Sequence, residues 1–249
     1  MWVAARYGNF AQAGGGAEAT PGSGYTGWWR ADGSDNLTDG GVVASITDRS
    51  SNANHMLQST GAAKPLYRAT GGPNSKPAVE ADGSDDEMFA TSDSSVHLTL
   101  SAGTVYAVFM SDSSGSNGDS VVNPTLYHFN NRVAQLWTNV PRALVRHYDG
   151  NDDLKNNGTN LSNSTWYACR IRYNGVNAFI LVNGGTEQSV ASGNIDSLAS
   201  SPNLFSQGGT RFWNGKYADL ITYNTCVSDN DATDTAARNY LSKRYALTL

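Results

Sequence analysis

The stretch WYACRIRYNGVNAFILVN, residues 166–183, decides the fold of this 249-residue chain. In its first half, apolar and basic residues alternate, with Cys169 and Ile171 on one side and Arg170 and Arg172 on the other. This two-residue period is typical of a strand with one buried face. An Asn-Gly pair follows at once, which is the signal for a tight hairpin, and a second run of β-branched and aromatic residues begins after it. The stretch therefore predicts two antiparallel strands joined by a short turn.

Runs of the same character recur along the chain between turn signals. Only 16% of the residues are charged and 26 are glycine, a composition that favours many turns over long helices. We therefore expect an all-β domain. The further predicted strands cover residues 104–110, 132–138, 142–148 and 216–223.

The C-terminal segment has a different period. Ser228 followed by acidic residues is typical of a helix start, since the hydroxyl caps the helix and negative charge favours its first turn. Helical spacing then places a set of side chains on one face. We predict a C-terminal helix over residues 229–245 that packs on the β domain, with an inner face formed by Ala232, Ala236, Tyr240 and Leu241.

Residues 11–24 have the composition of a linker, being rich in glycine, alanine and small polar residues without a hydrophobic period. On this basis we interpret residues 1–24 as an N-terminal arm or tether, and residues 25–249 as one domain that includes the C-terminal helix. Within that domain, residues 111–124 and 149–164 are long and polar. They predict surface loops that form a binding rim.

The charge and hydropathy of the chain argue against two classes of partner, nucleic acids and membranes. A net charge of −5 without a basic block argues against nucleic-acid binding, which relies on the release of phosphate counterions. No apolar run approaches the roughly 20 residues of a membrane span, and the N-terminus lacks a signal-peptide profile. We expect synthesis in the cytoplasm. Cys169 and Cys226 lie in apolar settings that favour buried thiols, although a disulfide between them stays an alternative.

The order of these segments resembles the laminin-G-like domains of the concanavalin A-like lectin/glucanase superfamily, which are found in phage and bacterial surface proteins. The resemblance extends from about Trp28 to Tyr245, and its most specific parts are SKPAVEADGSDD (75–86) and KYADLITY (216–223) with the helix after it. It implies a two-sheet antiparallel jelly-roll sandwich, in agreement with the strands read from the alternation.

The segment VEADGSDDEMF, residues 79–89, is the most acidic stretch of the chain. Glucanases of this superfamily carry an E-x-D-x-E or E-x-D-x-x-E strand, whereas this sequence has Glu80, Asp82 and Asp85 in that pattern, with Gly83 turning the chain between them. A retaining pair needs carboxylates roughly 5 to 5.5 Å apart across the sugar, so we predict that the protein is not an enzyme.

Calcium is the alternative reading of the same segment. Asp82, Asp85 and Asp86 are hard oxygen ligands gathered about a glycine turn, which makes them candidate calcium ligands, and a solvated turn is the simpler interpretation. Asp152 and Asp153, in the second polar loop, are candidates for approaching the same ion or a ligand.

Two tryptophans complete the set of candidate ligand-binding residues. An outward-facing Trp28 or Trp213 could stack on a sugar ring, although packing in the core is the alternative for each.

The function that these features favour is that of a non-enzymatic phage virion surface protein, either a capsid decoration or an adsorption appendage. In that role the arm would bind other virion proteins or copies of the chain, and the lectin-like domain would bind a cell-surface glycan weakly. A bacterial adhesion or carbohydrate-binding module, secreted or at the cell surface, is the alternative, and a glucanase is the third. Neither nucleic acid nor membrane insertion enters any of these.

Overall fold

The computed structural model describes part of the chain, and every structural statement below concerns that part. Backbone is described for residues 19–112, 127–128, 135–139, 142–148, 152–160, 162–191, 201–206, 209 and 212–249. Side chains are described within these ranges except at residues 127–160 and 190.

The described residues form β-strands, three short 3-10 helices and one α-helix. The first strands are β1 (Gly27–Ser34), β2 (Ser45–Asp48), β3 (Met56–Leu57), β4 (Leu66–Arg68), β5 (Ala78–Asp82), β6 (Met88–Ala90), β7 (Gly103–Ser111) and β8 (Tyr127–His128). The later strands are β9 (Gln135–Asn139), β10 (Arg142–Tyr148), β11 (Asp152–Asn160), β12 (Thr165–Tyr173), β13 (Asn177–Val182), β14 (Gln188–Ala191), β15 (Asn203–Leu204) and β16 (Asn214–Tyr223). The helices are η1 (Gly61–Ala63), η2 (Pro73–Ser75), η3 (Ser94–Val96) and α1 (Ala232–Tyr245).

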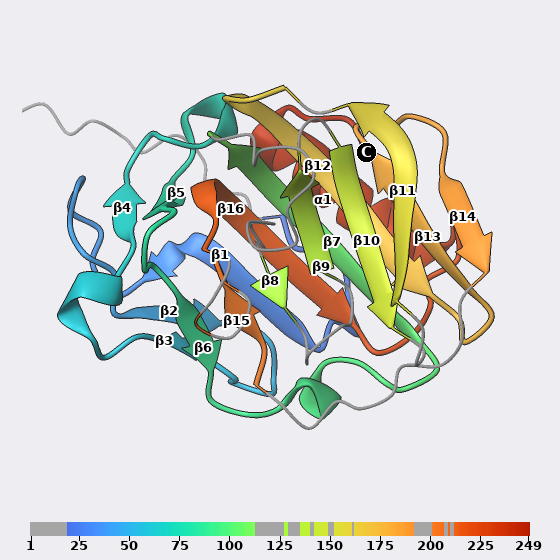
Figure 1. The fold of residues 1–249 in the computed structure, drawn as a ribbon, viewed down its shortest axis with the longest axis horizontal. Helices are drawn as coiled ribbons and strands as arrows, with labels where there is room; N and C mark the ends of the chain where they lie inside the picture. Colours follow the sequence, from blue (N-terminus) through green and yellow to red (C-terminus); the bar gives the residue numbers. More distant parts are fainter. Residues whose placement is uncertain are drawn as a thin grey trace, which may run out of the picture.

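The strands make an antiparallel sandwich, as predicted. A large sheet has the order β14-β13-β12-β7-β16-β1-β2-β3-β6-β15-β8, with β5 also paired to β16 and β4 to β5, and a second sheet has the order β11-β10-β9. Figure 1 shows β9, β10 and β11 in front of β7, β12 and β13, with α1 behind them. Contacts of β10 and β11 with β13, and of β8 with β9, bring the two sheets together.

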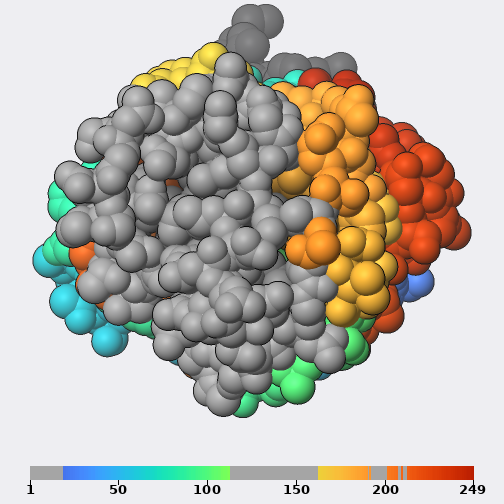
Figure 2. All heavy atoms as spheres, turned by 45° about the vertical axis from the view of Figure 1, so that its right-hand side comes forward, coloured from blue at the N-terminus to red at the C-terminus, as the bar shows by residue number. Residues whose placement is uncertain are grey.

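The central strands are buried on both faces, because the second sheet covers one and α1 covers the other. All nine residues of β7 are buried. Val105, Ala107 and Phe109 belong to the core between the sheets, whereas Tyr106 and Val108 belong to a second core beneath α1. On the surface, α1 lies beside the strands β13 and β14, red next to orange in Figure 2.

The helix starts later than predicted. Asp231 caps it, its side chain accepting a hydrogen bond from the backbone N–H of Asp234, so the helix begins at Ala232 and Ser228 is not the cap. The predicted inner face is correct for Tyr240 and Leu241 but wrong for Ala232, which is exposed. Asp234 is buried on this face of the helix instead, because its carboxylate forms an ion pair with buried Arg170 of the sheet.

Arg170 and Arg172, expected on a solvated face, lie beneath the start of α1. Arg170 is fully buried, and its Nη1 donates to Asp234 Oδ1 at 2.5 Å while its Nη2 donates to Glu187 at 2.6 Å and to Asp229 at 2.9 Å. Arg172 binds the other oxygen of Glu187 at 2.5 Å. The face is buried because α1 covers it. The ion pairs with carboxylates offset the cost of removing the two guanidinium groups from water.

The polar segment expected as a loop at 149–164 contains a strand. β11 pairs with β10 along most of its length, with a register shift between Arg142 and Leu144. Hydrogen bonding across the sheet has overridden a composition rich in Asn, Asp and Gly, residues that are depleted in strands.

Both ends of the described chain pack on the domain. The C=O of Pro21 accepts a hydrogen bond from Tyr223 Oη at 2.8 Å, so residues just before the predicted boundary at Tyr25 already contact β16. Residues 1–18 of the predicted arm lie outside the described range.

Cys169 and Cys226 are free thiols, Cys169 being buried. Among the helices described, none combines the length and the apolar character that crossing a membrane requires.

Candidate functional site

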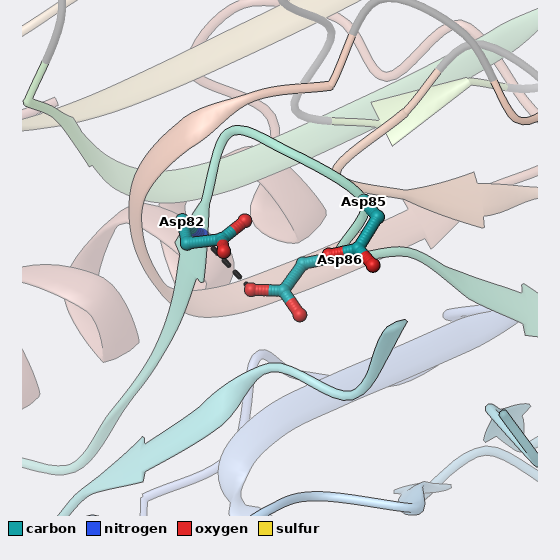
Figure 3. A group of neighbouring side chains, drawn as sticks. All are labelled: Asp82, Asp85 and Asp86. Atoms are coloured by element: carbon teal, nitrogen blue, oxygen red, sulfur yellow. Dashed lines mark hydrogen bonds between the residues drawn. The ribbon is translucent and has the colours of Figure 1, made fainter. Parts of the chain in front are cut away.

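The acidic turn between β5 and β6 brings the three predicted calcium ligands together. One carboxylate oxygen each from Asp82, Asp85 and Asp86 lie within 4.8 Å of one another. Two hydrogen bonds shape the turn: Asp86 Oδ2 accepts from the N–H of Asp82 at 2.9 Å, drawn in Figure 3, and Asp82 Oδ1 accepts from the N–H of Ser84 at 2.7 Å. Gly83 adopts a φ of +80°, which the turn requires.

The three carboxylates differ in burial. Asp82 and Asp85 are exposed, whereas Asp86 is buried. Burial, followed by the charges of Asp82, Asp85 and Glu80, raises the pKa of Asp86 to about 6, against a hydrogen bond from the Asp82 backbone that lowers it. A cation that neutralised these charges would favour the ionised form of Asp86. Chemically, the turn offers three hard oxygen ligands of the kind that Ca²⁺ prefers.

Glu80, the first acid of the glucanase-like pattern, forms ion pairs with two basic side chains. Its carboxylate binds the guanidinium of Arg68 and, at 3.0 Å, the Nζ of Lys216. Asp85 lies beyond the turn rather than further along the same strand, because β5 ends at Asp82. Within the described residues this segment therefore does not place a third acid on the strand, which the glucanase pattern needs.

The two tryptophans proposed as sugar platforms are core residues, so that prediction is wrong for both. Trp28 is 5% exposed, and its Nε1 donates to Asp219 Oδ1 at 3.0 Å beneath α1. Trp213 is 0% exposed and stacks on Phe205, with ring centroids 5.8 Å apart. The packing alternative was the right one, since Trp28 packs edge-on against Tyr25 and Tyr240 and Trp213 packs on Phe205.

Asp152 and Asp153 lie in β11, where they pair with Tyr148 and His147 of β10. Their side chains lie outside the described part, so their predicted approach to the acidic turn stays a prediction.

A further group of residues, which the sequence analysis missed, lies on the helix-covered face of the large sheet beyond the end of α1. Strand register aligns one residue from each of five strands in a row across the sheet. We call this the strand-end row: Trp166 (β12), Met110 (β7), Lys216 (β16), Glu80 (β5) and Leu66 (β4).

Trp166 is only partly buried, in contrast to the other two tryptophans. It packs against the core beneath α1 and is neither fully enclosed nor fully exposed. Its neighbour Met110 is 8% exposed and forms the floor of the row. The signal in the sequence was the alternation of Trp166 with buried Tyr167 at the start of a strand that follows a polar loop.

Ion pairs hold the charged side chains of the row in place. Lys216 Nζ lies 3.0 Å from Glu80 Oε1 and 3.0 Å from Asp112 Oδ2. The other oxygen of Asp112 accepts a hydrogen bond from Ser164 Oγ at 3.0 Å. Two residues from the Lys216–Glu80 pair along the same strands, Asn214 pairs with Asp82, so the strand-end row borders the acidic turn.

Comparison with known proteins shows the fold. No family model and no curated protein sequence matches the chain. Among solved structures, domain 4 of AbnA, an extracellular arabinanase from Geobacillus stearothermophilus in complex with arabinotriose, superposes with a TM-score of 0.55 at 11% identity. That match covers 86% of this chain and 98% of the arabinanase domain.

Two other solved structures match over part of their length. An arabinofuranosidase complexed with arabinofuranosyl-α-1,2-xylobiose matches with a TM-score of 0.53 at 12% identity, over 93% of this chain and 61% of that one. Botulinum neurotoxin type C, described as entering cells through two ganglioside molecules, matches with a TM-score of 0.53 at 10% identity, over 83% of this chain and 51% of that one. The chain thus spans a little over half of these two proteins. The chain folds as an antiparallel β-sandwich like these structures, and none of the three is described as a laminin-G domain.

Proposed function

We propose that this chain is a non-enzymatic, glycan-binding β-sandwich. One observation supports the proposal above the others: the chain matches nearly the whole of an arabinanase domain whose structure contains arabinotriose. The engagement of Glu80 by Arg68 and Lys216, and the turn between Asp82 and Asp85, favour binding over hydrolysis. Fold similarity alone does not carry chemistry, so binding needs its own test.

The setting that we propose is the surface of a phage particle, where the domain would serve as a capsid decoration or an adsorption appendage. The resemblance to domains of phage and bacterial surface proteins supports it, and a bacterial adhesion module is the alternative. Mass spectrometry of purified particles would detect the chain in stoichiometric amount if it is a virion component. Its absence from particles, with glycan binding intact, would favour the adhesion module.

We also propose Ca²⁺ as a stabilising ligand of the acidic turn, supported by the three carboxylates within reach of one ion. A ligand that binds the native state raises the melting temperature. Millimolar Ca²⁺ should therefore raise it in the native chain but not in Asp82→Ala, with Asp93→Ala, an acid of another turn, as the control. Equal shifts in all three proteins would show that the acidic turn is only a solvated turn.

Glycan binding is tested with the purified full chain on an oligosaccharide array that contains neutral and sialylated members, followed by calorimetric titration of each hit. Saturable binding without release of shorter sugars is expected. A silent array would reject glycan binding, whereas shortened oligosaccharides after incubation would show a glycosidase.

A further inference from the structure

We propose that the strand-end row is the glycan-binding surface and that it takes neutral rather than anionic oligosaccharides. This inference rests on the glycan-binding function proposed above and assigns it to particular residues. Figure 1 shows where the row lies: the end of β7, the starts of β12 and β16, and the end of β5 come together at the upper left.

The row provides an elongated surface. Its five residues come from five strands that are hydrogen-bonded neighbours in register. Neighbouring strands are about 4.8 Å apart, so the row extends for about 19 Å, which accommodates more than one sugar ring. Because the residues project from a sheet and not from loops, their spacing is fixed before a ligand binds.

The aromatic end of the row supplies the apolar contact. Trp166 is held from behind by the core beneath α1 and from the side by Met110, and it remains partly exposed. Binding sites for small molecules combine an aromatic or apolar wall with a few placed polar groups. The indole ring can therefore stack on the C–H face of a sugar, whereas buried Trp28 and Trp213 cannot.

The polar part of the row supplies oriented hydrogen-bonding groups. The ammonium of Lys216 has three N–H donors, and the contacts to Glu80 and Asp112 fix its position. Each carboxylate oxygen carries two acceptor sites, so Glu80 and Asp112 keep capacity for sugar hydroxyls after binding Lys216. The side chain of Lys216 is 19% exposed, and those of Glu80 and Asp112 are each 24% exposed.

The charge of this surface determines which sugars fit. Glu80, Asp112 and neighbouring Asp82 face two cations, Lys216 and Arg68, so one carboxylate is in excess. Carboxylate oxygens of Asp85 and Asp86 lie within 4.8 Å of one of Asp82 and add further negative charge. A Ca²⁺ ion bound at the acidic turn would offset most of it, and the carboxylates would still exceed the cations by one charge. Like charges across an interface suppress binding, so carboxylated sugars such as sialic acid are disfavoured. The ligand class is a neutral oligosaccharide rich in hydroxyl groups.

The experiment measures the affinity of the full chain for neutral array hits, with arabinotriose and 3′-sialyllactose as fixed probes. Trp166→Ala should weaken binding of a neutral hit more than tenfold. The matched control is Phe179→Ala, because Phe179 is also a partly buried aromatic residue of the large sheet but lies on β13. Its binding should stay within twofold of the native value.

Each outcome decides one statement. Neutral hits that Trp166→Ala retains would overturn the assigned site but leave the glycan-binding function standing. Hits confined to sialylated glycans would overturn the neutral ligand class. A silent array would reject the proposed function and the site with it.

A second measurement covers the case in which Trp166→Ala fails to fold. In the native chain, hydrogen exchange with and without a saturating neutral hit should slow at least threefold in peptides containing residues 110–112 and 164–166. Slowing confined to other segments would place the ligand elsewhere.

Discussion

Arg170→Met is expected to destabilise the fold strongly, because it leaves a buried carboxylate without its cation. Arg170 and Asp234 are both 0% exposed, and the guanidinium joins the start of α1 to β12. The substitution keeps the length and apolar stem of the side chain. The perturbation therefore falls on the charge and its hydrogen bonds.

The size of the effect follows from the partners that Asp234 keeps. Breaking a buried ion pair costs about 3–5 kcal/mol. Asp234 would still accept hydrogen bonds from Tyr106 Oη at 2.7 Å and from the N–H of Asn230 at 2.9 Å, and Arg238 lies 3.3 Å away. These contacts place the loss near the lower end, at about 3 kcal/mol. For a domain of this size, that corresponds to a melting temperature lowered by about 6–12 °C.

Calorimetric unfolding at pH 7 measures the effect, with Arg172→Met as the control. Arg172 is 12% exposed, and its partner Glu187 would keep Arg170 as a second cation, so removing Arg172 leaves Glu187 paired and should cost less than removing Arg170. The double variant Arg170→Met/Asp234→Asn should recover part of the loss, because it removes the uncompensated charge as well.

The loss should also depend on pH. Although burial opposes it, the hydrogen bond from Arg170 helps to hold the pKa of Asp234 below its ordinary value of 3.8. A lowered folded pKa contributes stability that is present above pH 4 and is lost as the pH falls. The difference between the native protein and Arg170→Met should therefore shrink on acidification below pH 4. A deficit no larger than that of Arg172→Met, or one independent of pH, would refute the reasoning.

Three further predictions concern stability. Burial raises the pKa of Asp219 to about 6, so this group favours folding increasingly as the pH falls from about 6 to 3.8, and Asp219→Asn should abolish that gain in urea titrations at a series of pH values. Trp213→Ala removes a fully buried ring and should cost about 3–5 kcal/mol by chemical denaturation; a smaller loss would mean that the site collapses around the cavity. Gly83→Ala combines a φ of +80° with a Cβ 2.7 Å from that of Asn214, so it should destabilise the acidic turn by more than 1 kcal/mol, whereas Gly61→Ala, which meets open space, should be neutral.

Local patterns were sufficient to predict the hairpin and most central strands. The alternation at Cys169 and Ile171 gave the buried face of β12, and the Asn-Gly pair gave the turn to β13. The strand-to-helix order at the C-terminus was also predictable, because capping and helical spacing are local properties. The cap itself was misplaced because several acidic residues and Ser228 compete for the same role.

Long-range contacts explain what could not be predicted. Arg170 and Arg172 read as solvent-facing because alternation reports the two faces of a strand without saying what covers each one. The strand-end row joins β4, β5, β16, β7 and β12, whose mutual register appears in no local pattern. The acidic turn was predictable as a cluster, since its members are close in sequence.

The position of β16 has a consequence for synthesis of the chain. It pairs with β7, β1 and β5 at once, although it lies near the C-terminus and β1 near the N-terminus. Until residues 214–223 leave the ribosome, the large sheet has a gap at its centre, with the edges of β1 and β7 open. Pairing between segments so distant in sequence slows folding. The domain therefore stays incomplete until residues 214–223 emerge, and its unpaired edges are where chaperones would be needed.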